Sequence, residues 1–148
     1  MLSNFLLLIV YLIIPTYSNK KLEYKVSGKL YCNKKPLLGT GFVLWKDNFY
    51  FVDNFVGRGL AATDGSFHIN AISDFPRLHD IYFQIIDRCN VASLDCYNVR
   101  RGYLKTSNAN KTSFGYEWNL GSIDMSSFET KIFQNFTIKI QCSNNNNN

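Results

Sequence analysis

The sequence is poor in the features that mark helical, disordered or metal-binding proteins. Charged residues make up only 18% of the chain, which is too few for a coiled coil or a long solvent-exposed helix. No Cys-x-x-Cys pair is present, so the ligand spacing of a structural zinc site is missing. With 12 Phe and 9 Tyr, the chain is too aromatic to be disordered. These observations predict a folded domain without a metal or other cofactor.

The size and charge of the chain narrow its class further. Its 148 residues suit one domain that is large enough to bury a hydrophobic core. The formal net charge of +5 and the pI of about 9.0 favour anionic surfaces in general, without selecting one. No Ser–His–Asp order, glycine-rich phosphate loop or paired-carboxylate motif stands out as the signature of an enzyme.

The first residues have the pattern of a secretory signal peptide. Phe5–Ile14 is an unbroken apolar run, shorter than the roughly 20 residues that span a membrane. Pro15 then breaks the run, and the small residues Thr16 and Ser18 follow two apart, as they do before a cleavage site. We therefore expect residues 1–18 to be removed, leaving a secreted, extracellular protein with no transmembrane segment. A buried strand or a membrane anchor is the alternative, and nucleic acid is not an expected partner.

Two short motifs agree with an extracellular protein. Asn110-Lys111-Thr112 and Asn135-Phe136-Thr137 both fit the acceptor sequence for N-glycosylation. Asn110 and Asn135 are therefore the predicted modification sites of a glycoprotein. Asn135 lies in an expected strand, which makes its modification less favoured than that of Asn110.

After residue 22 the chain alternates apolar and polar residues, the pattern of half-buried strands. The segments that we expect to form strands are residues 24–32, 41–45, 49–52, 67–70, 81–86, 100–105, 116–125 and 136–142. The segment 81–86 is apolar on both faces, which favours a central position in its sheet. Seven or eight short strands at this spacing predict an all-β domain over residues 19–143, built as an antiparallel sandwich or barrel.

Three further segments complete this reading of the chain. Gly57-Arg58-Gly59 is expected to be a flexible break between strands, and residues 72–80 could form one short helical turn. Residues 144–148 are all Asn, so we expect a disordered tail.

The four cysteines are an even number, as expected for disulfide bonds in an oxidising compartment. Cys89 and Cys96 flank a short polar loop, which favours a local bridge between them. Cys32 and Cys142 each end an apolar stripe, so a bridge between them would join the first strand to the last. We favour the pairs Cys32–Cys142 and Cys89–Cys96 among the three possible pairings.

Several landmarks follow one another in a defined order. They are Val26-x-Gly28-x-Leu30-x-Cys32, Pro36, Val43-Leu44, Asp53-Asn54 before Gly59, Thr63-Asp64-Gly65-Ser66-Phe67, Phe83-x-Ile85-x-x-x-Cys89, Cys96, Asn119-Leu120-Gly121-x-Ile123-Asp124-Met125 and Cys142. In this order, over about residues 24–142, the chain resembles the nematode transthyretin-like family of secreted proteins. The resemblance implies a transthyretin-like β-sandwich of two sheets and secretion, with no agreed chemistry.

The chain departs from the family pattern in three places. Asp87 stands where the family commonly has a His, two residues before the Cys that ends the central strand. The Pro expected after the second Cys of the pair is missing, and Arg100-Arg101 lie in its region. The turn from Thr63-Asp64 to Gly65 is shorter than usual. These departures weaken the transfer of any ligand site from the family to this chain.

Hydroxyisourate hydrolases share the transthyretin fold and provide an alternative function. Their site resembles a His and Arg cluster completed by a C-terminal Tyr-Arg-Gly-Ser, whereas this chain ends in Ile140-Gln141-Cys142-Ser143 and the Asn tail. A general base would have to be His68, which we expect to face outward from a strand, or His79, which lies in a loop. We therefore expect no enzyme, and a divergent hydroxyisourate hydrolase remains the alternative.

A binding role is the favoured function. If the turn after the first strand lies near Arg100, the basic residues Lys34, Lys35, Arg100 and Arg101 could form one anion-binding patch for phospholipid headgroups or acidic glycans. The aromatic run 49–51, together with Phe55, would either join the core or line a hydrophobic groove. The sequence thus predicts a secreted, non-catalytic protein that binds an extracellular protein, a lipid or a small hydrophobic ligand.

Overall fold

The computed structural model describes residues 21–48, 52–73, 81–127 and 133–143. These residues form β1 (Leu22–Cys32), β2 (Lys35–Pro36), β3 (Gly41–Lys46), β4 (Asn54–Leu60), β5 (Ser66–Ser73), β6 (Ile81–Asp87), β7 (Cys96–Leu104), the 3-10 turn η2 (Thr106–Asn108), β8 (Asn110–Lys111), β9 (Gly115–Asp124) and β10 (Phe133–Cys142). The expected signal peptide, the aromatic run 49–51, His79 and the Asn tail lie outside the described residues, as does most of the expected helical turn.

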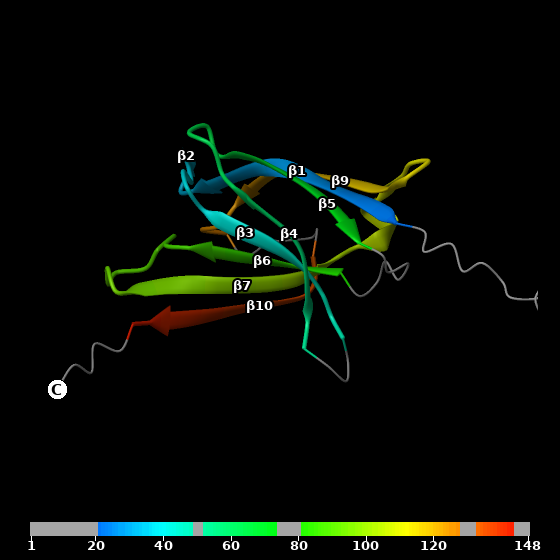
Figure 1. The fold of residues 1–148 in the computed structure, drawn as a ribbon. Coiled ribbons are helices and arrows are strands. Elements are labelled where there is room, and N and C mark those ends of the chain that lie inside the picture. Colours follow the sequence, from blue (N-terminus) through cyan, green and yellow to red (C-terminus); the bar gives the residue numbers. More distant parts are fainter. Residues whose placement is uncertain (1–20, 49–51, 74–80, 128–132, 144–148) are drawn as a thin grey trace, which may run out of the picture.

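The strands form two sheets that pack face to face (Figure 1). One sheet has the order β2-β1-β9-β8, with β5 also paired to β1, and the other has the order β10-β7-β6-β3-β4. Eight of the described strands have six residues or more, and β2 and β8 have two each. The predicted all-β sandwich of seven to eight strands is therefore confirmed, as is the central position of β6.

One pair of strands differs from the expected antiparallel arrangement, because β1 and β9 run parallel. Their register shifts between Ser27 and Lys29, opposite the point where Gly121 has a φ of +63°. A parallel neighbour needs a long crossover connection. Here the chain passes through the other sheet between β1 and β9, so β9 can enter beside β1 in the same direction.

The core lies between the sheets and follows the alternation seen in the sequence. Tyr24, Val26 and Leu30 of β1 are fully buried, as are Phe42 and Leu44 of β3. Its aromatic side chains pack closely, with ring centroids 4.4 Å apart for Phe42–Phe67, 5.9 Å for Phe42–Phe83 and 5.6 Å for Phe83–Phe133. These rings bury large apolar areas, which are the main favourable contribution to folding.

The segment Gly57-Arg58-Gly59 is part of β4, so the expected flexible break is wrong. A Cβ atom on Gly57 would lie 2.7 Å from Cβ of Ala71, and one on Gly59 would lie 2.4 Å from the Phe42 ring. The glycines are needed because β4 packs against β5 and the core at this edge, where a side chain has no room. Close packing, and not backbone freedom, therefore accounts for both glycines.

A tight turn joins β1 to β2, as expected for the segment after Cys32. Asn33 and Lys34 both have positive φ angles, of 49° and 66°, as a type I′ hairpin turn requires. The Asn33 side-chain amide donates to the side-chain oxygen of Asn90, over 2.9 Å. The Asp124 carboxylate accepts hydrogen bonds from Ser126 and from the backbone of this turn, which lowers the pKa of Asp124.

The two disulfide bonds join Cys32 to Cys89 and Cys96 to Cys142, so the favoured pairing was wrong. All four cysteines are bonded, as expected, but their partners follow from sheet topology. β10 lies beside β7, and Cys142 is the register partner of Cys96. Cys32 ends β1 in one sheet, Cys89 follows β6 in the other, and their bond ties the two sheets together.

The apolar stripe expected on the last strand is only partly inward. Of the expected stripe Phe136, Ile138, Ile140 and Cys142, the first two are half-buried, but Ile140 is 66% exposed and Cys142 is exposed. β10 is the edge strand of its sheet, so its far end extends beyond the core.

Candidate functional site

The expected basic patch is not assembled, because its members point in different directions. Lys34 and Lys35 are exposed in the turn between β1 and β2. Arg100 and Arg101 lie on β7 in the other sheet, where Arg100 is only 4% exposed and Arg101 is exposed. Consecutive residues of a strand point to opposite faces, so these two arginines cannot serve one surface.

Arg100 forms a buried ion pair with Asp87. Its Nε and Nη2 atoms donate to the two carboxylate oxygens over 2.6 and 3.2 Å. The same carboxylate accepts from the backbone N–H of Cys89 at 2.7 Å and from the Asn98 amide at 3.1 Å. The pair holds the ends of β6 and β7 beside the disulfide bond Cys32–Cys89, which is a structural role.

The remaining predicted site residues lie apart from one another. His68 is exposed on β5 opposite Ser27, and it faces outward as expected. Asn110 is exposed on the short strand β8. Asn135 is exposed on β10, at a register shift between Gln134 and Thr137, with a φ of +50°.

The side of the sheet β10-β7-β6-β3-β4 that points away from the core is here called the outer face. It is formed by the residues that alternate with the inward ones: Phe55, Arg58 and Leu60 of β4, Val43 and Trp45 of β3, Tyr82, Gln84 and Ile86 of β6, Val99, Arg101 and Tyr103 of β7, and Thr137 and Lys139 of β10. The register places these residues in rows across the strands.

Two neighbouring rows carry exposed positive charge: Arg58 and Arg101 lie in one, and Lys139 lies in the next, in line with Leu60 and Ile86. Arg58, Arg101 and Lys139 are exposed, and none of the three forms an ion pair with any residue that the structure describes. Arg101 lies over the ring of Tyr82, with its guanidinium carbon 5.7 Å from the ring centroid. This contact orients the arginine without neutralising its charge.

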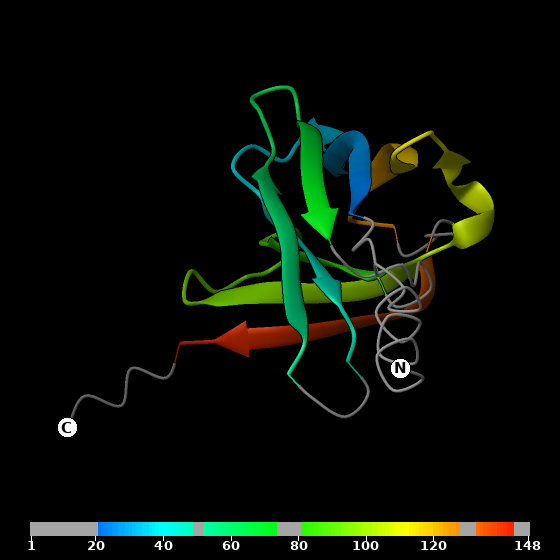
Figure 2. The same ribbon diagram turned by 45° about the vertical axis from the view of Figure 1, so that its right-hand side comes forward.

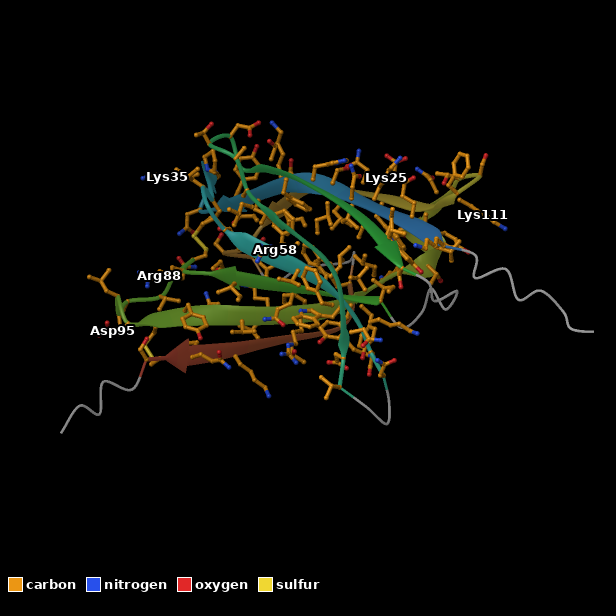
Figure 3. The ribbon with its side chains drawn as sticks, viewed as in Figure 1. Lys25, Lys35, Arg58, Arg88, Asp95 and Lys111 are labelled. Carbon is orange, nitrogen blue, oxygen red and sulfur yellow. A yellow bond between two sulfur atoms is a disulfide. The ribbon has the colours of Figure 1, made fainter. Side chains whose placement is uncertain are left out.

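Two cations of the opposite sheet, by contrast, form ion pairs. Lys25 pairs with Glu23 at 3.1 Å, and Lys29 pairs with Asp64 at 2.9 Å, a contact that raises the pKa of Lys29. Figure 3 shows Lys25 and Lys111 on that sheet and Arg58 and Arg88 on the sheet that carries the outer face. Lys35 and Lys111 of that sheet form no ion pair with a described residue, so unpaired cations occur on both sheets, but the two central ones of the opposite sheet, Lys25 and Lys29, are paired.

Apolar side chains are exposed at one end of the outer face. Leu60 is 72% exposed and Ile86 is 39% exposed, and Gly41 lies between them in the register. A Cβ atom on Gly41 would meet nothing within 4 Å. The space above Gly41, between the two side chains, is therefore open.

At the other end, the β3–β4 hairpin folds over the sheet. Asp47 follows β3 but accepts a hydrogen bond from the Tyr103 hydroxyl on β7, two strands away. Asp53 precedes β4 but accepts from the Tyr82 hydroxyl on β6 at 2.7 Å. Figure 1 and Figure 2 both show the two strands of this hairpin crossing β7 and β10. Burial, followed by the bond to Asp53, raises the pKa of Tyr82, which keeps its hydroxyl a donor.

A cavity of about 270 Å³ lies between the folded hairpin and strands β7 and β10. Its walls include Asp47, Asp53, Tyr82, Arg101 and Asn135. It is smaller than most drug-sized sites, and it combines aromatic walls with a few polar groups, as small-molecule sites do. No cluster of three or more possible metal ligands occurs within the described residues, and none of their helices is long and apolar enough to cross a membrane.

Sequence reasoning missed most of this face. It noted the alternation of Tyr82, Gln84 and Ile86 with buried residues, which was the available signal for the centre of the outer face. The folded hairpin had no such signal, because Asp47 and Asp53 meet their tyrosine partners only through the order of the strands.

Comparisons with known proteins support the architecture. The model of the transthyretin-like family matches residues 27–102, just over half of the chain and the part that contains β2 to β6 and most of β7. No curated protein matches.

Two solved structures are similar only distantly. A 9R-lipoxygenase from Cyanothece PCC8801 is 15% identical over 71% of this chain, with a TM-score of 0.43, and the match spans only 17% of the lipoxygenase. The dioxygenase domain of a dioxygenase carbohydrate-binding protein fusion from Streptomyces sp. SirexAA-E is 18% identical, with a TM-score of 0.44 over 74% of this chain and 84% of that domain. Similarity at this level gives no basis for a functional argument.

Proposed function

This chain belongs to the transthyretin-like family, and we propose that it is a secreted, non-catalytic protein that binds an anionic amphiphile, such as a lipid with an acidic headgroup, on the outer face. One observation carries the proposal. Exposed cations without ion pairs lie beside exposed apolar side chains on one face, whereas the described cations Lys25 and Lys29 of the opposite sheet are paired.

The two parts of the outer face suit the two parts of such a ligand. Arg58, Arg101 and Lys139 supply the attraction for a negative headgroup, worth about 1 kcal/mol for each basic residue near an anionic surface. The side chains of Leu60 and Ile86 can contact apolar groups of the ligand, because both are already exposed. A surface with both properties favours an amphiphile over a simple inorganic anion.

Two disulfide bonds in a small domain support an extracellular location, since such bonds persist in oxidising compartments. The signal-peptide pattern of residues 1–18 adds to this argument. Secretion would bring the outer face into contact with membranes or lipid carriers outside the cell.

Sedimentation with lipid vesicles tests the proposal directly. The oxidised protein should bind vesicles that contain an acidic phospholipid and should not bind purely zwitterionic ones, and added salt should weaken binding. The double variant Arg58→Glu/Lys139→Glu should lose at least about tenfold in affinity.

The opposite sheet provides the matched control. Lys25→Glu/Lys111→Glu makes the same change in net charge on the other layer of strands, and should leave binding almost unchanged. If both double variants lose affinity equally, the outer face has no special role. Equal binding to zwitterionic vesicles would also contradict the proposal.

A further inference from the structure

We infer that the cavity under the β3–β4 hairpin is a binding site for a neutral saccharide. This inference goes beyond the proposed function, because the cavity shares only Arg101 with the cationic rows and its two carboxylates give it a different charge. It rests on which polar groups the cavity presents, how firmly they are held and what net charge they carry.

The walls of the cavity are fixed before any ligand arrives. The Tyr82 hydroxyl is bound to Asp53, the Tyr103 hydroxyl is bound to Asp47, and the two rings lie 5.9 Å apart. Arg101 is stacked on Tyr82. A site whose groups are already oriented loses less conformational entropy when it binds a ligand.

Several polar groups at the cavity have no hydrogen-bond partner among the residues that the structure describes. The Asn135 amide and the Thr137 hydroxyl form no hydrogen bond with any described residue, and the Arg101 guanidinium makes only its contact with the Tyr82 ring. Asp47 uses one carboxylate oxygen for Tyr103, and its other oxygen can still accept a hydrogen bond. The cavity therefore presents free donors and free acceptors together.

A ligand that carries many hydroxyl groups fits this set best. Each hydroxyl can donate to a carboxylate oxygen and accept from a guanidinium or an amide. The C–H face of a sugar ring can pack on the half-buried ring of Tyr103, whereas the ring of Tyr82 is covered by Arg101. Aromatic walls with a few well-placed polar groups are typical of small-molecule sites.

The charge of the cavity argues for a neutral ligand. Asp47 and Asp53 bring two negative charges and Arg101 brings one positive charge. The two carboxylates disfavour an anion, and the fixed guanidinium disfavours a cation. Desolvating an unpaired ionic group would add a further cost, whereas a neutral saccharide avoids it.

The saccharide could come from two sources. Asn135 belongs to an N-glycosylation sequence and lines the cavity, so its own glycan would begin at this point. A separate glycan or free sugar is the other source. Both sources offer the same chemistry to Tyr103, Arg101 and Asp47.

Saturation-transfer NMR on the oxidised, unglycosylated chain tests the second source, with glucose, galactose, mannose, N-acetylglucosamine and chitobiose as probes. At least one of these sugars should bind. Arg101→Met and Asp47→Asn should each weaken that binding roughly 10- to 100-fold, the usual loss for a hydrogen bond to a charged group. Arg58→Met, on the same face outside the cavity, should bind as the unsubstituted chain does.

Protein that is glycosylated at Asn135 tests the first source. If the chain's own glycan fills the cavity, nuclear Overhauser contacts should join its first sugar to Tyr103, and added sugars should fail to bind. The inference is overturned if neither form shows a sugar in the cavity, or if Arg101→Met binds sugar normally. Vesicle binding should be unaffected by Asp47→Asn, so failure here is distinct from failure of the proposed function.

Discussion

Arg100 and Arg101 are neighbours on one strand, yet their surroundings have nothing in common. Arg100 points into the sandwich, where Asp87 holds its guanidinium through two hydrogen bonds. Arg101 points outward onto the ring of Tyr82 and has no ion pair with a described residue. One arginine is part of the fold and the other is available to a ligand. The pair shows that a dipeptide of like charge on a strand is not a patch.

The buried position of Arg100 also accounts for two of the three departures from the family pattern. Asp87 replaces the His that is common before the Cys ending the central strand, and Arg100 lies in the region where a Pro is missing. The structure brings these two departures together as one buried ion pair. A buried charge must have a partner, so the two positions make sense only jointly.

The largest expected effect is the difference in the free energy of unfolding between variants at Arg100 and at Arg101. Arg100→Met should lower the free energy of unfolding by about 3–5 kcal/mol, because it leaves the Asp87 carboxylate buried without its partner. Arg101→Met should change it by less than about 0.5 kcal/mol, since its side chain is on the surface. Urea unfolding of the oxidised proteins measures both values. Equal losses would remove the distinction between an inner and an outer arginine.

The two disulfide bonds also differ in how exposed their sulfur atoms are. Cys89 is 3% exposed, whereas Cys142 is exposed at the end of the edge strand. A reductant should therefore open Cys96–Cys142 first, because it must reach a sulfur atom to react. Removing Cys32–Cys89 by substituting both residues with Ala should then cost about 2–4 kcal/mol.

Mass spectrometry after graded reduction and alkylation reveals the order of opening. The two bonds close segments of similar length, with sequence separations of 57 and 46, so burial should dominate the difference. Prior opening of Cys32–Cys89 would indicate that this end of the sandwich is accessible, contrary to the inner role assigned to it.

Gly59 and Arg58 form a second pair of neighbours on opposite faces. Gly59→Ala should destabilise the protein by about 1–3 kcal/mol, because the new Cβ atom meets the buried Phe42 ring. Arg58→Ala should cost less than about 0.5 kcal/mol. Thermal or urea unfolding distinguishes the two variants. If Gly59→Ala leaves the free energy of unfolding unchanged, this edge is loosely packed and the close contact with Phe42 is wrong.

The smallest expected effect concerns Asp124, which is half-buried, whereas Asp87 is fully buried. Hydrogen bonds lower the pKa of Asp124 in the folded protein, so their stabilising effect is complete above the ordinary value of 3.8 and is lost as pH falls through the lower folded value. Asp124→Asn should therefore be less stable than the unsubstituted chain well above pH 3.8, by less than about 1 kcal/mol. Far below that pH the difference in stability should vanish. Urea unfolding curves at a pH well above 3.8 and at a pH far below it measure the difference. A difference that persists at the lower pH would contradict the assigned pKa effect.

Much of the fold could be predicted because a half-buried strand shows an alternation of apolar and polar residues in its own sequence. The alternation in residues 24–32 and 81–86 identified both faces of β1 and β6, and the order of landmarks indicated the family. Which strands pair with one another cannot be read from such a local pattern. The disulfide prediction failed because it placed β10 beside the first strand, whereas β10 pairs with β7 in the other sheet.

The candidate site was harder to predict for the same reason. Arg100 and Arg101 were predicted to share one anion-binding patch, whereas adjacent residues of a strand point to opposite faces. Tyr82 and Asp53 are 29 residues apart in sequence and meet only because the β3–β4 hairpin folds over β6. Gly57 and Gly59 looked like a break, because close packing and flexibility call for the same residue.

The claim that the outer face binds ligands can be tested most directly by mapping amide shifts in NMR spectra of the oxidised protein with lipid nanodiscs that contain an acidic phospholipid. The account predicts changes at Arg58, Leu60, Ile86, Arg101 and Lys139, and little change on β1, β5 and β9. Changes confined to β1, β5 and β9, or no change anywhere, would contradict it.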